Sequence, residues 1–288
     1  MKILVLGVSG MLGNAAFRVL RDEFGFDVHG TARSDAVRRY FPADAQDRIH
    51  TGIDVTDGDA LIGALARVRP DVVVNCIGVV KQLAAANDPL VTVPINTLLP
   101  HRLARAAELA GARLVHVSTD CVFNGKGGGL YTEASPPDAE DLYGRSKLLG
   151  EVDYPNAVTL RTSIIGRELN SSHALVDWLL SQTGRVRGFT RAVFSGLTTD
   201  ELTRVIASHV LPRPELRGVW HVSAAPIAKH DLLDIIRSVY GLSIEIDPDP
   251  SVVIDRSLDS SRFRAATGYT PPDWPAMIAR MRQCEASR

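Results

Sequence analysis

Two side chains that can exchange a proton stand four positions apart in the segment Tyr143-Gly-Arg-Ser-Lys147. On a helix this spacing places a phenol and an ammonium group on one face. Upstream, the apolar residues 114–117 end in Ser-Thr119-Asp, so a hydroxyl stands at the end of a buried strand. We predict that Thr119, Tyr143 and Lys147 are a catalytic set for ketone reduction. Thr119 would bind a carbonyl oxygen that Tyr143 protonates, and the Lys147 cation would lower the phenol pKa from about 10.

A glycine-rich turn near the start of the chain suggests where a hydride donor would bind. Residues 2–6 are a continuous apolar run typical of a buried parallel strand, and residues 14–20 have helical periodicity. Between them, Gly7 permits a tight turn, Gly10 lets the backbone approach a pyrophosphate, and Gly13 lets helix and strand pack closely. The alternative is three glycines in an ordinary turn. Three more residues of this turn are predicted to contact the cofactor: Ser9, Met11 and Leu12.

The second predicted strand ends in a basic segment that bears on the choice of cofactor. Sites that prefer NADH place Asp or Glu here to bind the ribose 2′-hydroxyl, whereas this chain has Arg33. The planar guanidinium suits a 2′-phosphate, so we predict NADP as the cofactor, with NADPH preferred over NADH. Asp35 lies close and weakens this preference, and the alternative is that Arg33 is a solvated surface residue.

Strands and helices alternate through the first 165 residues, which predicts an α/β fold with a Rossmann-type, doubly wound parallel sheet. Residues 1–166 and about 197–223 are assigned to the NADP-binding domain, and about 167–196 and 224–288 to a smaller, interwoven α/β substrate lobe. Ligands of such sheets lie beyond the carboxyl ends of the strands. Further cofactor contacts are therefore predicted at or near these ends: Asp54, Val55, Cys76, Ile77, Gly78, Ser118, Arg161, Thr162 and Ser163.

Polar and basic residues around the same edge are candidates for contacting a substrate. Residues 123–133 follow the Thr119 segment and are expected to form one wall of the substrate site. Lysine and arginine suit an anionic group, although solvated charges are the alternative. Asn96 is predicted either to cap a helix or to hold a water or a backbone carbonyl. The predicted substrate residues are Lys81, Phe123, Asn124, Asn170 and Arg191.

The composition argues against several other classes of protein. Of 288 residues, 45% are hydrophobic and 23% charged, and a net charge of −1 provides no basic field for nucleic acid. The chain has no apolar run long enough for a bilayer, no recognisable signal peptide and no metal-ligand spacing among its eight histidines. Its three cysteines are widely spaced, which fits a reducing compartment. We therefore expect a cytoplasmic protein without nucleic-acid, membrane or metal partners, for which a homodimer is a candidate assembly.

Together these motifs resemble the extended short-chain dehydrogenases/reductases, and within them the dTDP-4-dehydrorhamnose reductases and related nucleotide-sugar reductases. The resemblance implies a 4-keto-6-deoxy nucleotide-diphosphate sugar as substrate, the same catalytic set, and residues 161–163 beside the nicotinamide. The chain departs from the family at Cys121, where an aromatic residue is usual, and in the arginine-rich segment 168–195. The motifs are GVSGMLG at 7–13, DVVVNCIG at 71–78, HVSTDCVF at 116–123, YGRSKLLGE at 143–151 and LRTS at 160–163.

Two other functions are compatible with these residues. A nucleotide-sugar epimerase or dehydratase would keep NAD(P) bound and reoxidise it internally, and Asp120 beside Thr119 could act as the additional acid or base. A non-catalytic, NADP-binding regulatory subunit would need neither Tyr143 nor Lys147. The presence of both residues favours an NAD(P)-dependent oxidoreductase.

Overall fold

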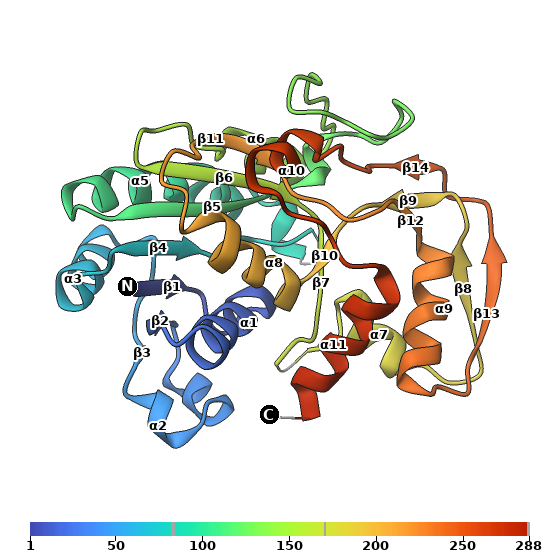
Figure 1. Ribbon diagram of the computed structural model, residues 1–288, viewed down its shortest axis with the longest axis horizontal. Helices are drawn as coiled ribbons and strands as arrows, with labels where there is room; N and C mark the ends of the chain where they lie inside the picture. Colours follow the sequence, from blue (N-terminus) through green and yellow to red (C-terminus); the bar gives the residue numbers. More distant parts are fainter. Residues whose placement is uncertain (82–83, 170, 287–288) are drawn as a thin grey trace.

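Seven parallel strands form the central sheet of the computed structural model, which describes residues 1–81, 84–169 and 171–286. Within these residues the strand order is β11-β6-β5-β4-β1-β2-β3 (Figure 1). The winding reverses between β1 and β4, which confirms the predicted doubly wound sheet. All seven strands run parallel, so their carboxyl ends share one edge. The strands are β1 (Lys2–Leu6), β2 (Asp27–Thr31), β3 (Ile49–His50), β4 (Val72–Asn75), β5 (Arg113–Thr119), β6 (Ala157–Thr162) and β11 (Gly218–His221).

The strand registers decide which side chains reach that edge. Leu6, the last residue of β1, is level with Asn75, the last residue of β4. Asn75 is in turn level with His116 on β5, and β5 continues to Thr119. Thr119 therefore projects beyond the end of the neighbouring β4, where a bound ligand can reach its hydroxyl.

Helices cover both faces of the sheet, which explains why its strands are apolar on both sides. Val73 and Val74 of β4 point to opposite faces and are fully buried in different hydrophobic cores. Burying each such side chain stabilises the fold by roughly 1.5–3 kcal/mol. One core contains residues of α1 (Met11–Arg18) and α8 (Thr199–Val205), and the other contains residues of α3 (Gly58–Val68) and α5 (Leu99–Leu109).

A smaller α/β lobe lies beside the sheet and is built from the later part of the chain (Figure 1). The two parts are interwoven, because β10 (Leu197–Thr198) returns to pair with β7 (Ile164–Ile165) before the chain enters α8. This confirms the predicted smaller lobe. Its elements are α7 (Leu175–Leu180), β8 (Arg185–Phe189), β9 (Ala192–Phe194), β12 (Ile227–Ala228), α9 (Lys229–Tyr240), β13 (Glu245–Asp249), β14 (Ile254–Asp255) and α11 (Trp274–Ala286). Helix α10 (Ser261–Thr267) packs instead on β11 of the central sheet.

Some predicted element boundaries differ from the structure. The third strand, β3, ends at His50, so Asp54 lies in the turn after it rather than at its end. Asp57 caps α3, because its carboxylate accepts hydrogen bonds from the amides of Asp59 and Ala60. Asn96 does not cap a helix, since it lies inside a helical stretch that begins with α4 (Pro89–Thr92) and passes through η4 (Val93–Leu98) to α5. Among the described residues, no helix combines the length and apolar character needed to cross a membrane.

A pair of stacked histidines joins β2 to the edge strand β3 and makes the fold sensitive to acid. Nδ1 of His29 lies 3.0 Å from Nε2 of His50, with ring centroids 5.3 Å apart. Burial lowers the pKa of each imidazole below its usual value, and nearby cations, Arg48 for His29 and Arg67 for His50, add to the effect. The unfolded chain therefore binds more protons than the folded one once the pH falls below about 6.5, so stability declines as the pH drops.

We predict that replacing His50→Gln makes the melting temperature less dependent on pH between 7 and 5. Glutamine keeps a polar group beside His29 but cannot gain a charge. Thermal unfolding across this pH range provides the measurement, with the exposed His173→Gln as the matched control. Parallel melting curves for wild type and His50→Gln would show that the pair does not confer the acid sensitivity.

Candidate active site

The glycine turn between β1 and α1 has the geometry that a pyrophosphate requires. Gly7 has a φ of +83°, in the left-handed region that favours glycine. A Cβ placed on Gly13 would lie 2.1 Å from the Gly7 carbonyl oxygen, so backbone packs directly on backbone there. Gly10 precedes the first turn of α1 and has no side chain to cover the helix amides. The turn thus leaves room for a phosphate group at the start of the helix, and its residues fit a dinucleotide.

The end of β2 is joined to this turn and carries the predicted cofactor-selecting arginine. The carbonyl oxygen of Thr31 accepts hydrogen bonds from the amides of Gly7 and Val8, at 3.2 and 3.0 Å. Arg33 follows, exposed to solvent. The pKa of Asp54 is lowered, chiefly by the backbone and hydroxyl hydrogen bonds of Thr56 and also by the charge of Arg33. Arg33 and Asp54, predicted as cofactor residues, are therefore neighbours at this edge.

The predicted catalytic residues come together at the ends of β5 and α6 (Leu142–Leu149). The Thr119 hydroxyl donates to the Asp120 carboxyl at 3.1 Å and accepts from the Cys121 amide at 3.1 Å. The same hydroxyl acts on the Tyr143 phenol, because it lowers the phenol pKa against the larger effect of burial. The ammonium of Lys147 donates to the carbonyl of Val117 on β5, at 2.8 Å. Strand β5 and helix α6 therefore bring the three residues to the same edge of the sheet.

Burial governs the proton affinities of these groups. It raises the pKa of Tyr143, and the neighbouring Cys121, Asp120 and Asp141 raise it further. Burial lowers the pKa of Lys147 to about 8, although the carboxylate of Glu151 acts in the opposite direction. The expectation of a lowered phenol pKa is therefore wrong for this structure. The Lys147 ammonium bonds a backbone carbonyl of β5, and the phenol remains protonated near neutral pH.

The residues predicted at the end of β4 lie beside the glycine turn. The Ile77 side chain packs so close to Gly7 that a Cβ on Gly7 would lie 2.7 Å from it. Cys76 is half-buried, and the loss of solvent around its thiol raises the thiol pKa to about 12. The Asn96 side chain accepts from the amide of Val79 at 2.8 Å and donates to its carbonyl at 3.1 Å. Asn96 thus fixes the segment just after Gly78, which confirms the carbonyl-binding alternative.

Two predicted cofactor residues are engaged inside the protein instead. The guanidinium of Arg161 forms a buried two-point ion pair with Glu151, with both contacts at 2.6 Å. Ser118 donates to the same carboxylate at 2.7 Å. Thr162, at the end of β6, donates to the Ser163 carbonyl at 3.1 Å. The side chains of Ser118 and Arg161 therefore serve internal packing, and a contact of residues 161–163 with the nicotinamide stays a prediction.

Some of the predicted substrate residues lie at the surface, whereas Phe123 lies inside the protein. Lys81 is exposed and pairs with Asp141, the residue that caps α6, at 2.5 Å, so it lies close to Tyr143. Phe123 is fully buried and stacks on Tyr131 with ring centroids 4.2 Å apart, so we revise its predicted role from substrate wall to internal support. The remaining residues are Asn124, whose side-chain Oδ1 accepts from the backbone amide of Lys126, Arg191, which is exposed after β8, and Asn170, which lies outside the described residues.

Arg256 is a candidate site residue that no sequence motif indicates. It follows β14, and its Nε donates to the carbonyl of Phe123 at 2.7 Å. Its positive charge partly offsets the burial that raises the pKa of Asp120, and it helps to lower the pKa of Asp141. The guanidinium therefore lies near the carboxyl groups beside Thr119 and Tyr143. The pairing of residue 256 with residue 123 arises from the tertiary fold, because no local pattern connects segments so far apart in the chain.

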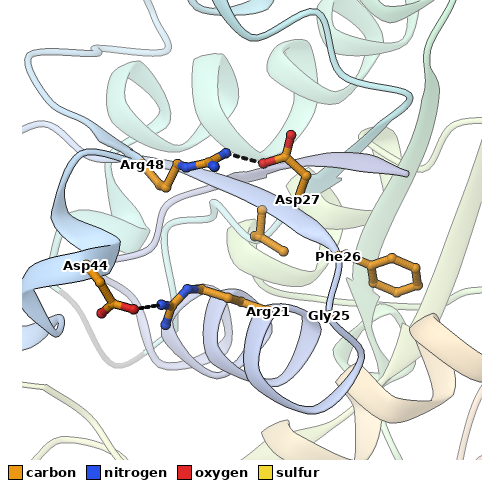
Figure 2. A pocket seen from close by; sticks show the side chains of 7 residues that line it. Arg21, Gly25, Phe26, Asp27, Asp44 and Arg48 are labelled. Carbon is orange, nitrogen blue, oxygen red and sulfur yellow. Dashed lines mark hydrogen bonds and ion pairs between the residues drawn. The ribbon is translucent and has the colours of Figure 1, made fainter.

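A separate pocket of about 310 Å³ lies at the opposite end of β2 (Figure 2). Its two arginines, Arg21 and Arg48, are paired with Asp44 and Asp27 across the pocket, as the dashed lines show. Asp27 begins β2, whereas the cofactor turn meets the other end of that strand at Thr31. The pocket is therefore not part of the candidate active site. Across the part of the chain described here, no three His, Cys, Asp or Glu side chains gather as a metal site would require.

The parallel sheet, the glycine turn and the hydroxyl, phenol and lysine at its edge define a dinucleotide-binding protein of the extended short-chain dehydrogenase/reductase type. More narrowly, the chain belongs to the family of the RmlD substrate binding domain, whose model matches residues 1–283.

Similar proteins carry reductase names. The chain is 37% identical over 148 residues to a dTDP-4-dehydrorhamnose reductase from Streptomyces griseus, a match that covers 51% of this chain and 43% of that protein, less than half of its length. It is 31% identical over 252 residues to a probable low-salt glycan biosynthesis reductase, Agl14, from Haloferax volcanii, covering 84% of this chain and 81% of that one. A dTDP-4-dehydrorhamnose reductase from Bacillus anthracis, solved in complex with NADP, has the same fold, with a TM-score of 0.79 at 20% identity over 98% of both chains.

We predict that Gly13→Ala strongly weakens NADPH binding, because the added methyl group would overlap the carbonyl oxygen of Gly7 and push α1 away from β1. Fluorescence titration with NADPH measures the effect. Gly63→Ala is the matched control, since a Cβ at this position in α3 meets open space and stabilises a helix by roughly 0.5–1 kcal/mol. Unchanged NADPH affinity in Gly13→Ala would contradict the assignment of this turn.

Proposed function

We propose that this protein is an NADPH-dependent reductase of a 4-keto-6-deoxy nucleotide-diphosphate sugar, of the dTDP-4-dehydrorhamnose reductase type. The observation that carries the proposal is the meeting of Thr119, Tyr143 and Lys147 beside a glycine turn shaped for a dinucleotide. The reductase names of the relatives support the same reaction class. Membership of the RmlD family supports a sugar nucleotide as the substrate class.

In this mechanism, bound NADPH supplies the hydride that reduces the keto carbon. The Tyr143 phenol donates the proton that the carbonyl oxygen needs, and its raised pKa keeps that proton available at neutral pH. Thr119 orients the same oxygen through its hydroxyl, which the Cys121 amide holds in place. Lys147, with a pKa of about 8, is largely protonated at pH 7 and can donate to a ribose hydroxyl or restore charge balance after proton transfer.

We also propose how the cofactor is held and selected. The glycine turn with Ser9, Met11 and Leu12 would bind the pyrophosphate, and Arg33 would bind the 2′-phosphate that distinguishes NADPH from NADH. Asp54 and Val55 would border the adenosine, and Cys76, Ile77 and Gly78 would line the cleft beside β4. We further propose that residues 1–166 and about 197–223 form the domain that binds the cofactor. Residues of about 167–196 and 224–288 would form the lobe that binds the sugar nucleotide.

An epimerase or dehydratase reaction with internal cofactor recycling is the second candidate, and one observation favours it. Asp120 lies beside Thr119 and is buried, which raises its pKa and makes a protonated carboxyl available in the site. Stoichiometric oxidation of NADPH with a keto-sugar nucleotide would identify the reductase, whereas nucleotide retained through purification would identify the second candidate. The regulatory-subunit alternative has less support, because the complete set of Thr119, Tyr143 and Lys147 is assembled here.

The location and assembly form a further part of the proposal. Three cysteines that lie far apart in the sequence fit a reducing, cytoplasmic location. Leu90 on α4 and Leu149 at the end of α6 are 85% and 64% exposed on helices that contact each other. These exposed apolar side chains on two contacting helices are the observation that supports a homodimer.

We predict that Tyr143→Phe lowers turnover of the keto-sugar nucleotide by roughly 10²–10⁴-fold while NADPH affinity stays close to that of wild type. The phenol supplies the proton but is not required to anchor the cofactor. Steady-state kinetics and NADPH titration measure the two effects. Tyr154→Phe is the control, because it removes a hydroxyl that bonds His101 at 3.0 Å on another part of the surface. Full activity in Tyr143→Phe would refute the mechanism.

We predict that Arg33→Ala weakens NADPH binding by at least about tenfold and leaves NADH binding nearly unchanged, since a charge-assisted bond to phosphate contributes about 1.5–3 kcal/mol. Parallel titrations with the two cofactors measure the ratio of their affinities. Arg102→Ala, an exposed arginine on α5, controls for the loss of a surface charge. An equal loss for both cofactors would assign Arg33 a role other than recognising the 2′-phosphate.

A further inference from the structure

Behind the active-site edge, buried polar groups join β5, the end of α6, β6 and β11 in one chain. Glu151 accepts hydrogen bonds from Ser118 on one side and Arg161 on the other. The third guanidinium nitrogen of Arg161, Nη1, lies 3.3 Å from Nε2 of His221. The Arg161 and Glu151 side chains are each only 6% exposed, so this chain runs through the protein interior. Breaking it would leave an uncompensated buried charge.

The partners of His221 fix its protonation state. Arg161 can only donate, so Nε2 of His221 must accept that bond. On the other side of the ring, Nδ1 lies 2.9 Å from the carbonyl oxygen of Tyr131, which can only accept. His221 is therefore a neutral imidazole with its proton on Nδ1, and it connects the buried ion pair to the loop at residues 123–133. The backbone amide of His221 adds a bond to Glu133, at 2.9 Å.

That loop has an unusual backbone conformation, and it is bonded to other parts of the chain on two sides. Gly125, Gly128 and Gly129 all have positive φ, and Leu130 has a φ of +51°, which is unfavourable for a leucine. One side of the loop is held by the C-terminal lobe, where the Tyr131 amide donates to the carbonyl of Ser257 at 2.9 Å. The other side is held by His221, whose ring also lies edge-on to Phe123.

We propose that His221, supported by Arg161 and Glu151, is a positioning residue that fixes residues 123–133 against the carboxyl edge of the sheet. The loop joins the strand that carries Thr119 to the helix that carries Tyr143 and Lys147. The Glu151 carboxylate at the other end of the chain of contacts also faces Lys147. The loop, the ion pair and the catalytic lysine therefore belong to one connected unit. A loop that is held less firmly would also weaken binding of the substrate, and this expectation rests on the proposed reductase function. The positioning of the loop by His221 does not depend on that function.

Two substitutions of His221 each break one link. In His221→Gln the amide can still accept from Arg161 through an oxygen near the Nε2 position, but the donor to Tyr131 is lost. In His221→Asn the amide nitrogen can take the place of Nδ1 and keep the bond to Tyr131, but the acceptor for Arg161 is lost. Val210→Ala, a cavity-forming change at a fully buried site in η6 (Ile206–Val210), serves as a control for lost stability away from the loop.

Hydrogen exchange of the backbone amides at pH 7.5, followed by mass spectrometry, tests the proposal without requiring a substrate. We expect amides of residues 123–133 to exchange roughly tenfold faster in His221→Gln, as for loss of one buried hydrogen bond, and about threefold faster in His221→Asn. In Val210→Ala the loop should stay as protected from exchange as in wild type, even if the melting temperature of this variant falls as far as that of the His221 variants. Should His221→Gln not fold, His221→Asn carries the test.

The proposal is overturned if the loop exchanges at the wild-type rate in the folded His221 variants, or if Val210→Ala exposes it equally. With active enzyme, we further expect the KM for the keto-sugar nucleotide to rise several-fold while the affinity for NADPH is unchanged. If wild type turns over no keto-sugar nucleotide but the loop result holds, the proposed function fails and the positioning role of His221 stands.

Discussion

The close contact between helix α1 and strand β1 sets the geometry on which the candidate active site depends. At Gly13 the helix backbone lies against the Gly7 carbonyl so closely that a Cβ would stand 2.1 Å from that oxygen. This contact directs the first amides of α1 toward the carboxyl edge of the sheet. The ends of β2 and β4 meet the same turn through Thr31 and Ile77. A position for a dinucleotide and a position for the catalytic hydroxyl are thereby fixed on one edge.

Burial then gives the groups at this edge their chemical character. The carboxyl of Asp120 and the ammonium group of Lys147 are buried, and the phenol of Tyr143 is half-buried. The low polarity of the surroundings favours the neutral forms, so the pKa of Tyr143 and of Asp120 rises while that of Lys147 falls. The site thus holds protons that it can donate, which suits reduction of a carbonyl. The same burial strengthens the hydrogen bond of Lys147 to Val117 and that of the Thr119 hydroxyl to the Cys121 amide, because water does not compete for them.

The substrate side of the site is assembled from segments distant in sequence. The loop at residues 123–133 is held by the segment after β14 on one side and by His221 on the other. Arg256 reaches the Phe123 carbonyl from the smaller lobe and brings a positive charge near Asp120. Both anchors come from outside the loop: one from the segment after β14 and one from His221 on the sheet strand β11.

The sequence by itself determined the features that depend on local rules. The glycine spacing predicted the turn, the apolar runs predicted the parallel sheet, and the four-residue spacing of Tyr143 and Lys147 predicted their shared helix face, because each depends on backbone geometry over a few residues. Only the tertiary structure decided which polar groups pair with one another. It turned Arg161 inward to Glu151, buried Phe123 beneath its loop and brought Arg256 to the site. Such pairings follow from the register and packing of distant elements, for which one sequence has no periodic signal.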